Sequence, residues 1–253
     1  MVEVSAMSRV LNTVPQVVSG RTLAAGVAWK PAASVEPLMG HARKWMAASA
    51  GQCLLFAVCA AVSVAAPGQY NTVLDIGDTA PQWRALPGTD GAKHSSDELA
   101  DKKAVVVVFT CNSCPYAVDI EDRLINLHQA FADRGVAIVA INVNKIEEDR
   151  LPAMKEKAET RKFAFAYLFD ETQDIARAFG AKYTPEFFVL DAQRRIRYMG
   201  SLDDSPDGRD VAKTYVSDAV ESVLAGDEIT IRETVPVGCR IRFERTRRKR
   251  KQK

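Results

Sequence analysis

The sequence predicts an α/β domain with a mixed central sheet and helices on both of its faces. Two continuous apolar, β-branched runs, at residues 104–110 and 136–143, are typical of strands that are buried on both faces. Each run is followed by a segment with helical character, which is the order of a strand–helix–strand crossover. Two further apolar segments, at residues 186–190 and 196–199, are close enough in sequence to form a hairpin, which would make the sheet mixed.

The other elements follow from local signals. Pro-Gly at 87–88 and Asp-Gly at 90–91 mark turns and predict a short hairpin. After residue 115, apolar side chains recur at helical spacing up to Gly135, at Ile120, Leu124, Leu127 and Phe131. Later elements are also predicted, namely a charged helix at 150–162, a short strand at 165–169, and helices at 172–179 and 213–224 that end near Gly180 and Gly226.

Composition allows one core of ordinary domain size with chain to spare, since 47% of the 253 residues are hydrophobic and 26% are charged. The net charge of +2 hides an uneven distribution, because residues 240–253 are strongly basic and residues 66–239 are net acidic. We expect 240–253 to be a disordered tail that could weakly contact an anionic membrane surface or cell-wall polymer. Nucleic acid is not expected as a partner of an exported chain.

An export signal is predicted ahead of the folded domain. Arg43 and Lys44 precede a short apolar stretch at 53–64, and small residues at 63–65 suit a cleavage site. We therefore expect residues 39–66 to be a signal peptide, with an uncleaved membrane anchor as the alternative. Export would place the protein in the periplasm or another extracytoplasmic space, where the conditions are oxidising.

Residues 1–38 resemble neither a signal n-region nor a folded unit, and Met39 is an alternative start. Cleavage is expected after Ala65 or Ala66, which leaves residues 70–239 as the redox domain.

Two cysteines lie where the strand at 104–110 meets the following helix, in the sequence Cys111-Asn-Ser-Cys114-Pro115. A helix N-terminus lowers the pKa of a nearby thiol, and the thiolate is the form that attacks disulfides. The second thiol can then close a disulfide with the first. Zinc sites use the same spacing, but they need further ligands, and the chain has three histidines: His41, His94 and His128. A static disulfide is the other alternative.

Together with Thr184-Pro185 before the apolar strand at 186–190, this motif resembles the thioredoxin-like superfamily. The likeness is closest to its exported redoxin branch, between thioredoxins and the alkyl-hydroperoxide-reductase group, and covers about residues 72–241. It implies a thioredoxin-like fold in which Cys111 attacks, Cys114 resolves and Pro185 is a cis-proline beside the dithiol. It also implies that the Thr184 backbone pairs with a substrate peptide and that no bound cofactor is required.

The sequence departs from the pattern of the superfamily at two positions. Thioredoxins carry a buried acid six residues before the first cysteine, and here that position is Val105. Peroxiredoxins carry a threonine three residues before the peroxidatic cysteine, and the residue three before Cys111 is Val108. Proton transfer would then depend on water or another group, and a peroxide-activating site is not evident.

Several other side chains are candidates with more than one interpretation. Tyr116, beside the CxxC, and Trp83 are either packing residues or substrate contacts. Cys239 is an inert buried thiol, a third redox cysteine that reaches the CxxC, or a site for pairing with another chain. Four acids could hold a proton for the dithiol or serve as surface and capping charges: Asp75, Asp78, Glu121 and Asp122.

The sequence thus predicts an exported, monomeric thiol–disulfide oxidoreductase that exchanges disulfides with protein or small thiol substrates. A membrane or periplasmic electron donor or acceptor would complete its cycle. One alternative is a thiol-dependent peroxidase that uses Cys111, with Cys114 or Cys239 as the resolving residue. Another is a non-enzymatic module that handles metal on the same fold.

Overall fold

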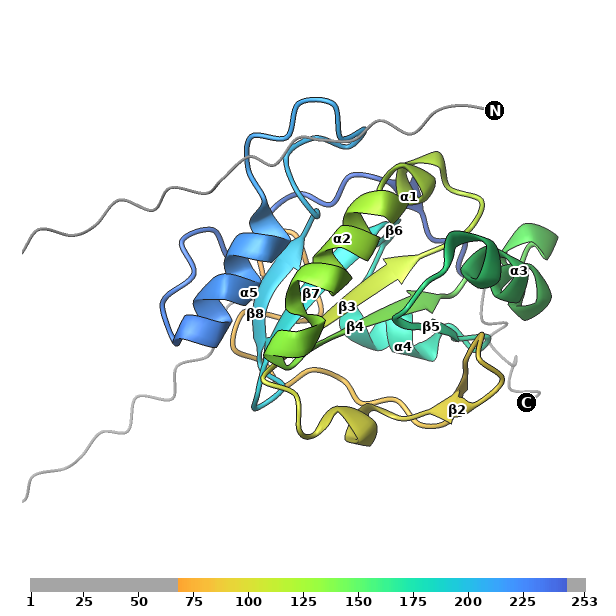
Figure 1. Cartoon of the computed structure of the whole chain (residues 1–253), viewed down its shortest axis with the longest axis horizontal. Helices are drawn as coiled ribbons and strands as arrows, with labels where there is room; N and C mark the ends of the chain where they lie inside the picture. Colours follow the sequence, from red (N-terminus) through yellow and green to blue (C-terminus); the bar gives the residue numbers. More distant parts are fainter. Residues whose placement is uncertain (1–67, 245–253) are drawn as a thin grey trace, which may run out of the picture. The chain divides into compact units, whose positions relative to one another are not determined.

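Five strands form the central sheet, in the order β5-β4-β3-β7-β8 (Figure 1). The computed structural model describes residues 68–244. The sheet strands are β3 (Ala104–Thr110), β4 (Val136–Asn142), β5 (Ala166–Phe169), β7 (Glu186–Asp191) and β8 (Ile196–Gly200). β3, β4 and β5 are parallel, whereas β7 runs antiparallel to β3, and β8 antiparallel to β7. The sheet is therefore mixed, as predicted.

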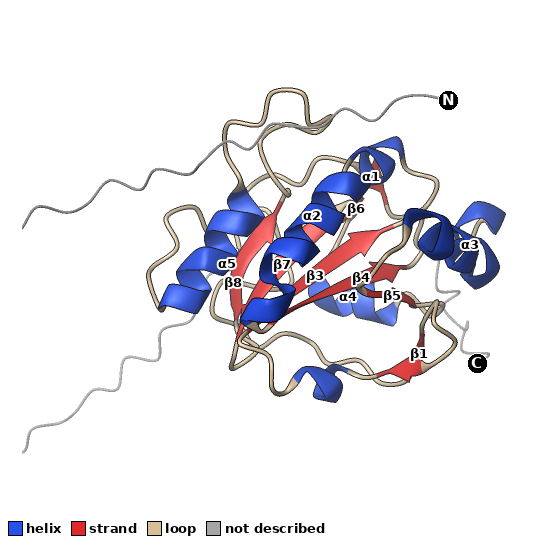
Figure 2. Cartoon of the chain, viewed as in Figure 1, coloured by secondary structure: helices blue, strands red, loops and turns tan. Residues whose placement is uncertain are grey.

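Helices cover both faces of this sheet (Figure 2). The helices are α1 (Pro115–Asp119), α2 (Glu121–Phe131), α3 (Leu151–Arg161), α4 (Asp174–Phe179) and α5 (Tyr215–Ala225). Because strand side chains alternate, Val106 and Val108 of β3 pack in the core that holds α2, α3 and α5, while Val107 and Phe109 pack in the core that holds α4. β3 is buried on both sides, which explains its unbroken apolar sequence.

The helix predicted after the CxxC is divided in two. Ile120, with φ −91° and ψ −5°, separates α1 from α2, and a 3₁₀ turn at Ala132–Arg134 follows α2. Ile120 is itself buried in the core against which α2 packs. The segment that carries Cys114 is thus a short helix of its own, which the apolar spacing did not reveal.

Short strand pairs and 3₁₀ turns complete the fold. β1 (Leu86–Pro87) and β2 (Lys93–His94) form the predicted hairpin, followed by a 3₁₀ turn at Ser96–Leu99. A further 3₁₀ turn, Glu147–Asp149, precedes α3. β6 (Tyr183–Thr184) pairs with β9 (Cys239–Arg240), a pairing that the sequence did not predict.

The β6–β9 pair corrects the expected end of the domain. The boundary was predicted at residue 239, with a disordered tail from 240 onward, but Arg240 lies in β9 and the Ile241 side chain is buried in the core. The rest of the predicted tail, residues 245–253, lies outside the described residues, as do the predicted extension at 1–38 and signal peptide at 39–66. Within residues 68–244, no helix is both long enough and apolar enough to cross a bilayer.

Candidate active site

The dithiol lies at the carboxyl end of β3, where the strand meets α1 (Figure 1). Cys111 is the first residue after the strand, and Cys114 is the N-cap of α1, with Pro115 as the first residue of that helix. Proline is suited to this position because its missing N–H would have no helical partner there. Both cysteines are free thiols in the structure.

Thr184 contacts both sulfurs from β6. The Cys114 thiol donates to the Thr184 carbonyl oxygen at 3.0 Å, and Cys111 Sγ lies 3.4 Å from Thr184 Oγ1. The Thr184–Pro185 peptide bond is cis, as predicted. The structure therefore brings together Cys111, Cys114, Thr184 and Pro185 from two distant parts of the sequence.

The two thiols share a hydrogen bond, so their ionisation belongs to the pair. When Cys111 donates this bond, the pKa of Cys114 falls to about 5 in spite of burial, while donating the bond and burial raise the pKa of Cys111. The groups around the two sulfurs favour the reverse assignment, in which Cys111 has the lowered pKa. The Thr184 carbonyl beside Cys114 can only accept a hydrogen bond, whereas the Thr184 hydroxyl, 3.4 Å from Cys111 Sγ, can donate one to a thiolate there. We therefore place the first negative charge on Cys111, with Cys114 keeping its proton.

Asp149 is a residue of this site that the sequence analysis missed. Its carboxylate is fully buried and accepts three hydrogen bonds from the loop between the cysteines. Oδ1 accepts from the N–H groups of Asn112 and Ser113 at 2.7 and 2.9 Å, and Oδ2 accepts from the Ser113 hydroxyl at 2.7 Å. Asp149 therefore holds the CxxC loop in place from the 3₁₀ turn before α3.

Asn112 is held separately by its side chain. Tyr167 of β5 donates to Asn112 Oδ1 at 2.8 Å, and Asn112 Nδ2 donates to the Glu148 carbonyl at 2.8 Å. Asn142, at the end of β4, donates to the Asp149 carbonyl at 2.8 Å. Tyr167 of β5 thus holds Asn112 directly, and Asn142 of β4 holds the dipeptide between the cysteines through Asp149.

Comparison with known proteins identifies the family. The model of the AhpC/TSA family matches residues 76–199, a span that includes the CxxC and Pro185. A solved structure of a hypothetical protein from Sinorhizobium meliloti is 33% identical, with a TM-score of 0.64, and the match covers 68% of this chain and 96% of that chain. This chain belongs to the redoxin branch of the thioredoxin-like superfamily.

Two further solved structures are similar to this redoxin. An uncharacterized conserved protein from Geobacillus kaustophilus is 31% identical with a TM-score of 0.65, over 72% of the redoxin and 100% of that chain. A thiol:disulfide interchange protein of the thioredoxin family from Chlorobium tepidum is 24% identical with a TM-score of 0.47, over 60% of the redoxin and 99% of that chain. No curated protein sequence matches significantly. Membership of this family indicates an oxidoreductase.

Access to the dithiol is limited, and the expected substrate pairing needs correction. Disulfide exchange requires an accessible sulfur, but Cys111 and Cys114 of the redoxin are only 3% and 2% exposed. The resemblance implied that the Thr184 backbone pairs with a substrate peptide, but in the structure Thr184 lies opposite Cys239 of β9. The redoxin's own C-terminal segment fills that position. Cys239 is half-buried and packs against the cluster of Cys111, Cys114 and Ala117, so it lies beside the CxxC.

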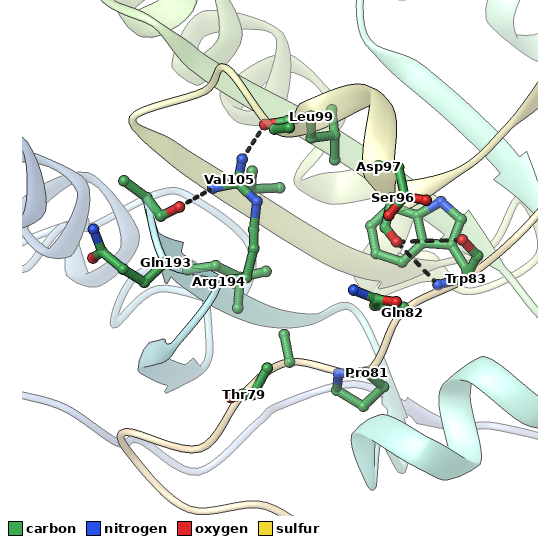
Figure 3. A pocket seen from close by; sticks show the side chains of 14 residues that line it. Thr79, Pro81, Gln82, Trp83, Ser96, Asp97, Leu99, Val105, Gln193 and Arg194 are labelled. Carbon is green, nitrogen blue, oxygen red and sulfur yellow. Dashed lines mark hydrogen bonds between the residues drawn. The ribbon is translucent and has the colours of Figure 1, made fainter.

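Val105 lies at the other end of β3 from the dithiol. It lines a cavity together with Trp83, Leu99 and Arg194, whose guanidinium donates to the Leu99 carbonyl (Figure 3). The position where thioredoxins carry an acid therefore does not adjoin the sulfurs here. Trp83 is 3% exposed and belongs to the core, so it is a packing residue.

Besides Asp149, a further buried acid at the dithiol end of the sheet is Glu186, immediately after the cis-proline. Its carboxylate accepts the N–H groups of Lys182 and Tyr183 at 2.7 and 2.9 Å, and burial raises its pKa. These bonds fix the turn that leads into β6 and Thr184. Sequence could have suggested Glu186 only through its place after Pro185.

The remaining candidates have ordinary surface or structural contacts. Tyr116 is 41% exposed and lines a small hollow with Pro185 and Val237, so it stays available to a substrate. The side chains of Asp75 and Asp78 accept nearby backbone N–H groups. Glu121 and Asp122 both pair with Arg161. Among residues 68–244, no group of three or more His, Cys, Asp or Glu side chains has the arrangement of a metal site.

Proposed function

We propose that this redoxin is a thiol–disulfide oxidoreductase whose redox pair is Cys111 and Cys114. The Cys111 thiolate attacks one sulfur of a substrate disulfide, and the other substrate sulfur leaves as a thiolate. Cys114 then loses its proton and attacks Cys111 Sγ, which forms the Cys111–Cys114 disulfide and releases the second substrate thiolate. The substrate gains two electrons and the dithiol loses two, and the reverse sequence oxidises a dithiol substrate.

The observation that supports this proposal best is the placement of both sulfurs around Thr184. Cys111 Sγ faces the Thr184 hydroxyl, which can stabilise a thiolate, and Cys114 Sγ holds its proton toward a carbonyl 3.0 Å away. The two sulfurs therefore differ in role although they are equally buried. A lowered first pKa of the pair supplies the thiolate that the reaction needs at neutral pH.

The substrates we propose are protein disulfides or small disulfides in an extracytoplasmic compartment, with a membrane or periplasmic donor or acceptor of electrons. The support for export is the predicted signal at 39–66 and the use of a dithiol in a chain of this family. A monomer suffices for the chemistry, because both sulfurs come from one chain.

A thiol-dependent peroxidase is the second candidate, and the match to the AhpC/TSA family model is the observation that favours it. The residue three before Cys111 is Val108, which is fully buried and offers no hydroxyl to a peroxide. This position leaves Cys111 without the threonine that peroxiredoxins use.

The test is to follow two activities of the purified protein side by side. Reduction of insulin by dithiothreitol should accelerate in its presence, while hydrogen peroxide consumption should not. Equilibration with glutathione should yield a Cys111–Cys114 disulfide, detected by mass spectrometry after alkylation. Its reduction potential gives the direction, since about −270 mV is typical of a reductant and about −120 mV of an oxidant. Peroxide consumption without disulfide turnover would replace this proposal with the peroxidase.

A further inference from the structure

Three cysteines of the described chain meet around one residue, Thr184. Its carbonyl accepts from the Cys114 thiol at 3.0 Å, and its hydroxyl lies 3.4 Å from Cys111 Sγ. The same hydroxyl oxygen lies 3.5 Å from the Cys239 carbonyl oxygen, and the backbones of Thr184 and Cys239 are register partners. The Cys239 side chain packs against the buried cluster that Cys111 and Cys114 form with Ala117.

The position of Cys239 is built into the fold by the residues on both sides of it. Gly238 passes so close to β6 that a Cβ atom there would lie 2.2 Å from the Thr184 carbonyl oxygen. On the other side, Ile241 donates its N–H to the Lys182 carbonyl at 2.9 Å, and its side chain is buried. Farther along, Gln173 donates to the Arg242 carbonyl at 3.0 Å. The strand that carries Cys239 is therefore anchored against the dithiol.

The three cysteines differ in their exposure to solvent. Cys111 and Cys114 are 3% and 2% exposed, whereas Cys239 is half-buried at the surface edge of the cluster. An external thiol therefore meets Cys239 before it meets the buried pair.

We propose that Cys239 is a third redox cysteine that exchanges with Cys114 and so carries the disulfide from the buried pair to the surface. This inference rests on the proposed thiol–disulfide function of the pair. The partner that collects the disulfide is an external dithiol, which attacks Cys239.

The exchange is balanced within the protein. The Cys239 thiolate attacks Cys114 Sγ of the oxidised pair, so that the Cys114–Cys239 bond forms, the Cys111–Cys114 bond breaks, and Cys111 leaves as a thiolate. The proton lost by Cys239 passes to solvent, and no electrons are gained or lost. The external dithiol then reduces the Cys114–Cys239 disulfide by two electrons and becomes a disulfide itself.

The electrostatics of the cluster fit this order of events. Burial and the hydrogen bond to Cys114 raise the pKa of Cys239 in the reduced protein. When Cys114 enters a disulfide, that hydrogen bond is lost and only burial remains. Cys239 therefore becomes a better nucleophile when the pair is oxidised, which is when the exchange requires it.

The test uses the full chain with Cys111→Ser, which leaves Cys114 and Cys239 as the only cysteines of the cluster. After treatment with glutathione disulfide and rapid alkylation, peptide mass mapping should find an intramolecular Cys114–Cys239 disulfide in most molecules. The matched control, Cys111→Ser/Cys239→Ser, should instead carry glutathione on Cys114. In the wild-type background, Cys239→Ser should keep the Cys111–Cys114 disulfide but slow its reduction by dithiothreitol about 10-fold or more.

The outcomes separate this inference from the proposed function. If the wild type forms the Cys111–Cys114 disulfide but Cys111→Ser yields only glutathione adducts, Cys239 is not a redox cysteine and the proposed function stands. If the wild type forms no Cys111–Cys114 disulfide, both the function and the relay are wrong.

A second variant keeps all three sulfurs and moves only the strand. Gly238→Ala forces β9 away from the Thr184 carbonyl, and in the Cys111→Ser background it should lower the yield of the Cys114–Cys239 disulfide. Circular dichroism should show that the domain remains folded. An unchanged yield would mean that the β6–β9 pairing does not position Cys239 for exchange.

Discussion

Replacement of Cys111 by serine is expected to lower insulin reduction by on the order of 1,000-fold or more, because a hydroxyl does not attack disulfides at neutral pH. The matched variant, Cys114→Ser, removes the sulfur that releases the substrate. It should lose turnover as well, but it should accumulate a mixed disulfide between Cys111 and insulin. Non-reducing electrophoresis followed by peptide mapping distinguishes the two variants.

The opposite pattern would reverse the assignment of roles. If Cys111→Ser accumulated the mixed disulfide and Cys114→Ser did not, Cys114 would be the attacking sulfur. The question is open to experiment because hydrogen bonding within the pair can place the lowered pKa, about 5, on Cys114. The contact with the Thr184 hydroxyl points to Cys111 instead.

The lowered first pKa of the dithiol predicts how its reactivity depends on pH. A lowered first pKa means that the thiolate is present above that pKa and is lost as the pH falls through it. In the wild type, the rate of alkylation by iodoacetamide should therefore stay high at neutral pH and fall in acid. An ordinary thiol would lose reactivity already below about pH 8.5.

What the sequence predicted well is local in the chain. Residues 104–110 read as a buried strand, and the CxxC after them fixed the place of the dithiol at the end of that strand. The family resemblance carried by the CxxC and by Thr184-Pro185 before an apolar strand implied that Pro185 is cis, and the structure confirms it. Each of these signals is a short run of consecutive residues or a pair of such runs.

What the sequence did not predict depends on how loops return to the site. Asp149 follows two exposed acids, and only the path of the chain from β4 into α3 decides that it is the buried one. The docking of Cys239 depends on strand pairing between residues more than fifty positions apart. The break at Ile120 is hidden because its side chain keeps the apolar spacing of a continuous helix.

Substitution of Asp149 should affect both stability and reactivity. Asp149→Ala removes the acceptor of three hydrogen bonds, from two N–H groups and the Ser113 hydroxyl. Because hydrogen bonds to a buried charged group are individually worth about 1.5–3 kcal/mol and water can reach the exposed Ser113, we expect a loss of about 2–4 kcal/mol in the free energy of unfolding. Urea denaturation of the reduced protein measures this loss.

Asp149→Asn separates the charge from the hydrogen bonds. The amide oxygen can still accept from the loop, so the loss of stability should be smaller than for Asp149→Ala. Besides the hydrogen bond to Cys114 and burial, the charge of Asp149 raises the pKa of Cys111. Its removal should therefore shift the alkylation profile to lower pH.

The control for both Asp149 variants is Glu148→Gln. Glu148 is the adjacent acid, its side chain is exposed, and it contributes to the site only through its backbone carbonyl. The substitution changes the net charge as Asp149→Asn does, but it should leave the unfolding free energy and the pH profile nearly unchanged, because water screens an exposed charge. An equal effect of Glu148→Gln and Asp149→Asn would show that overall charge, and not the buried carboxylate on the CxxC loop, tunes this dithiol.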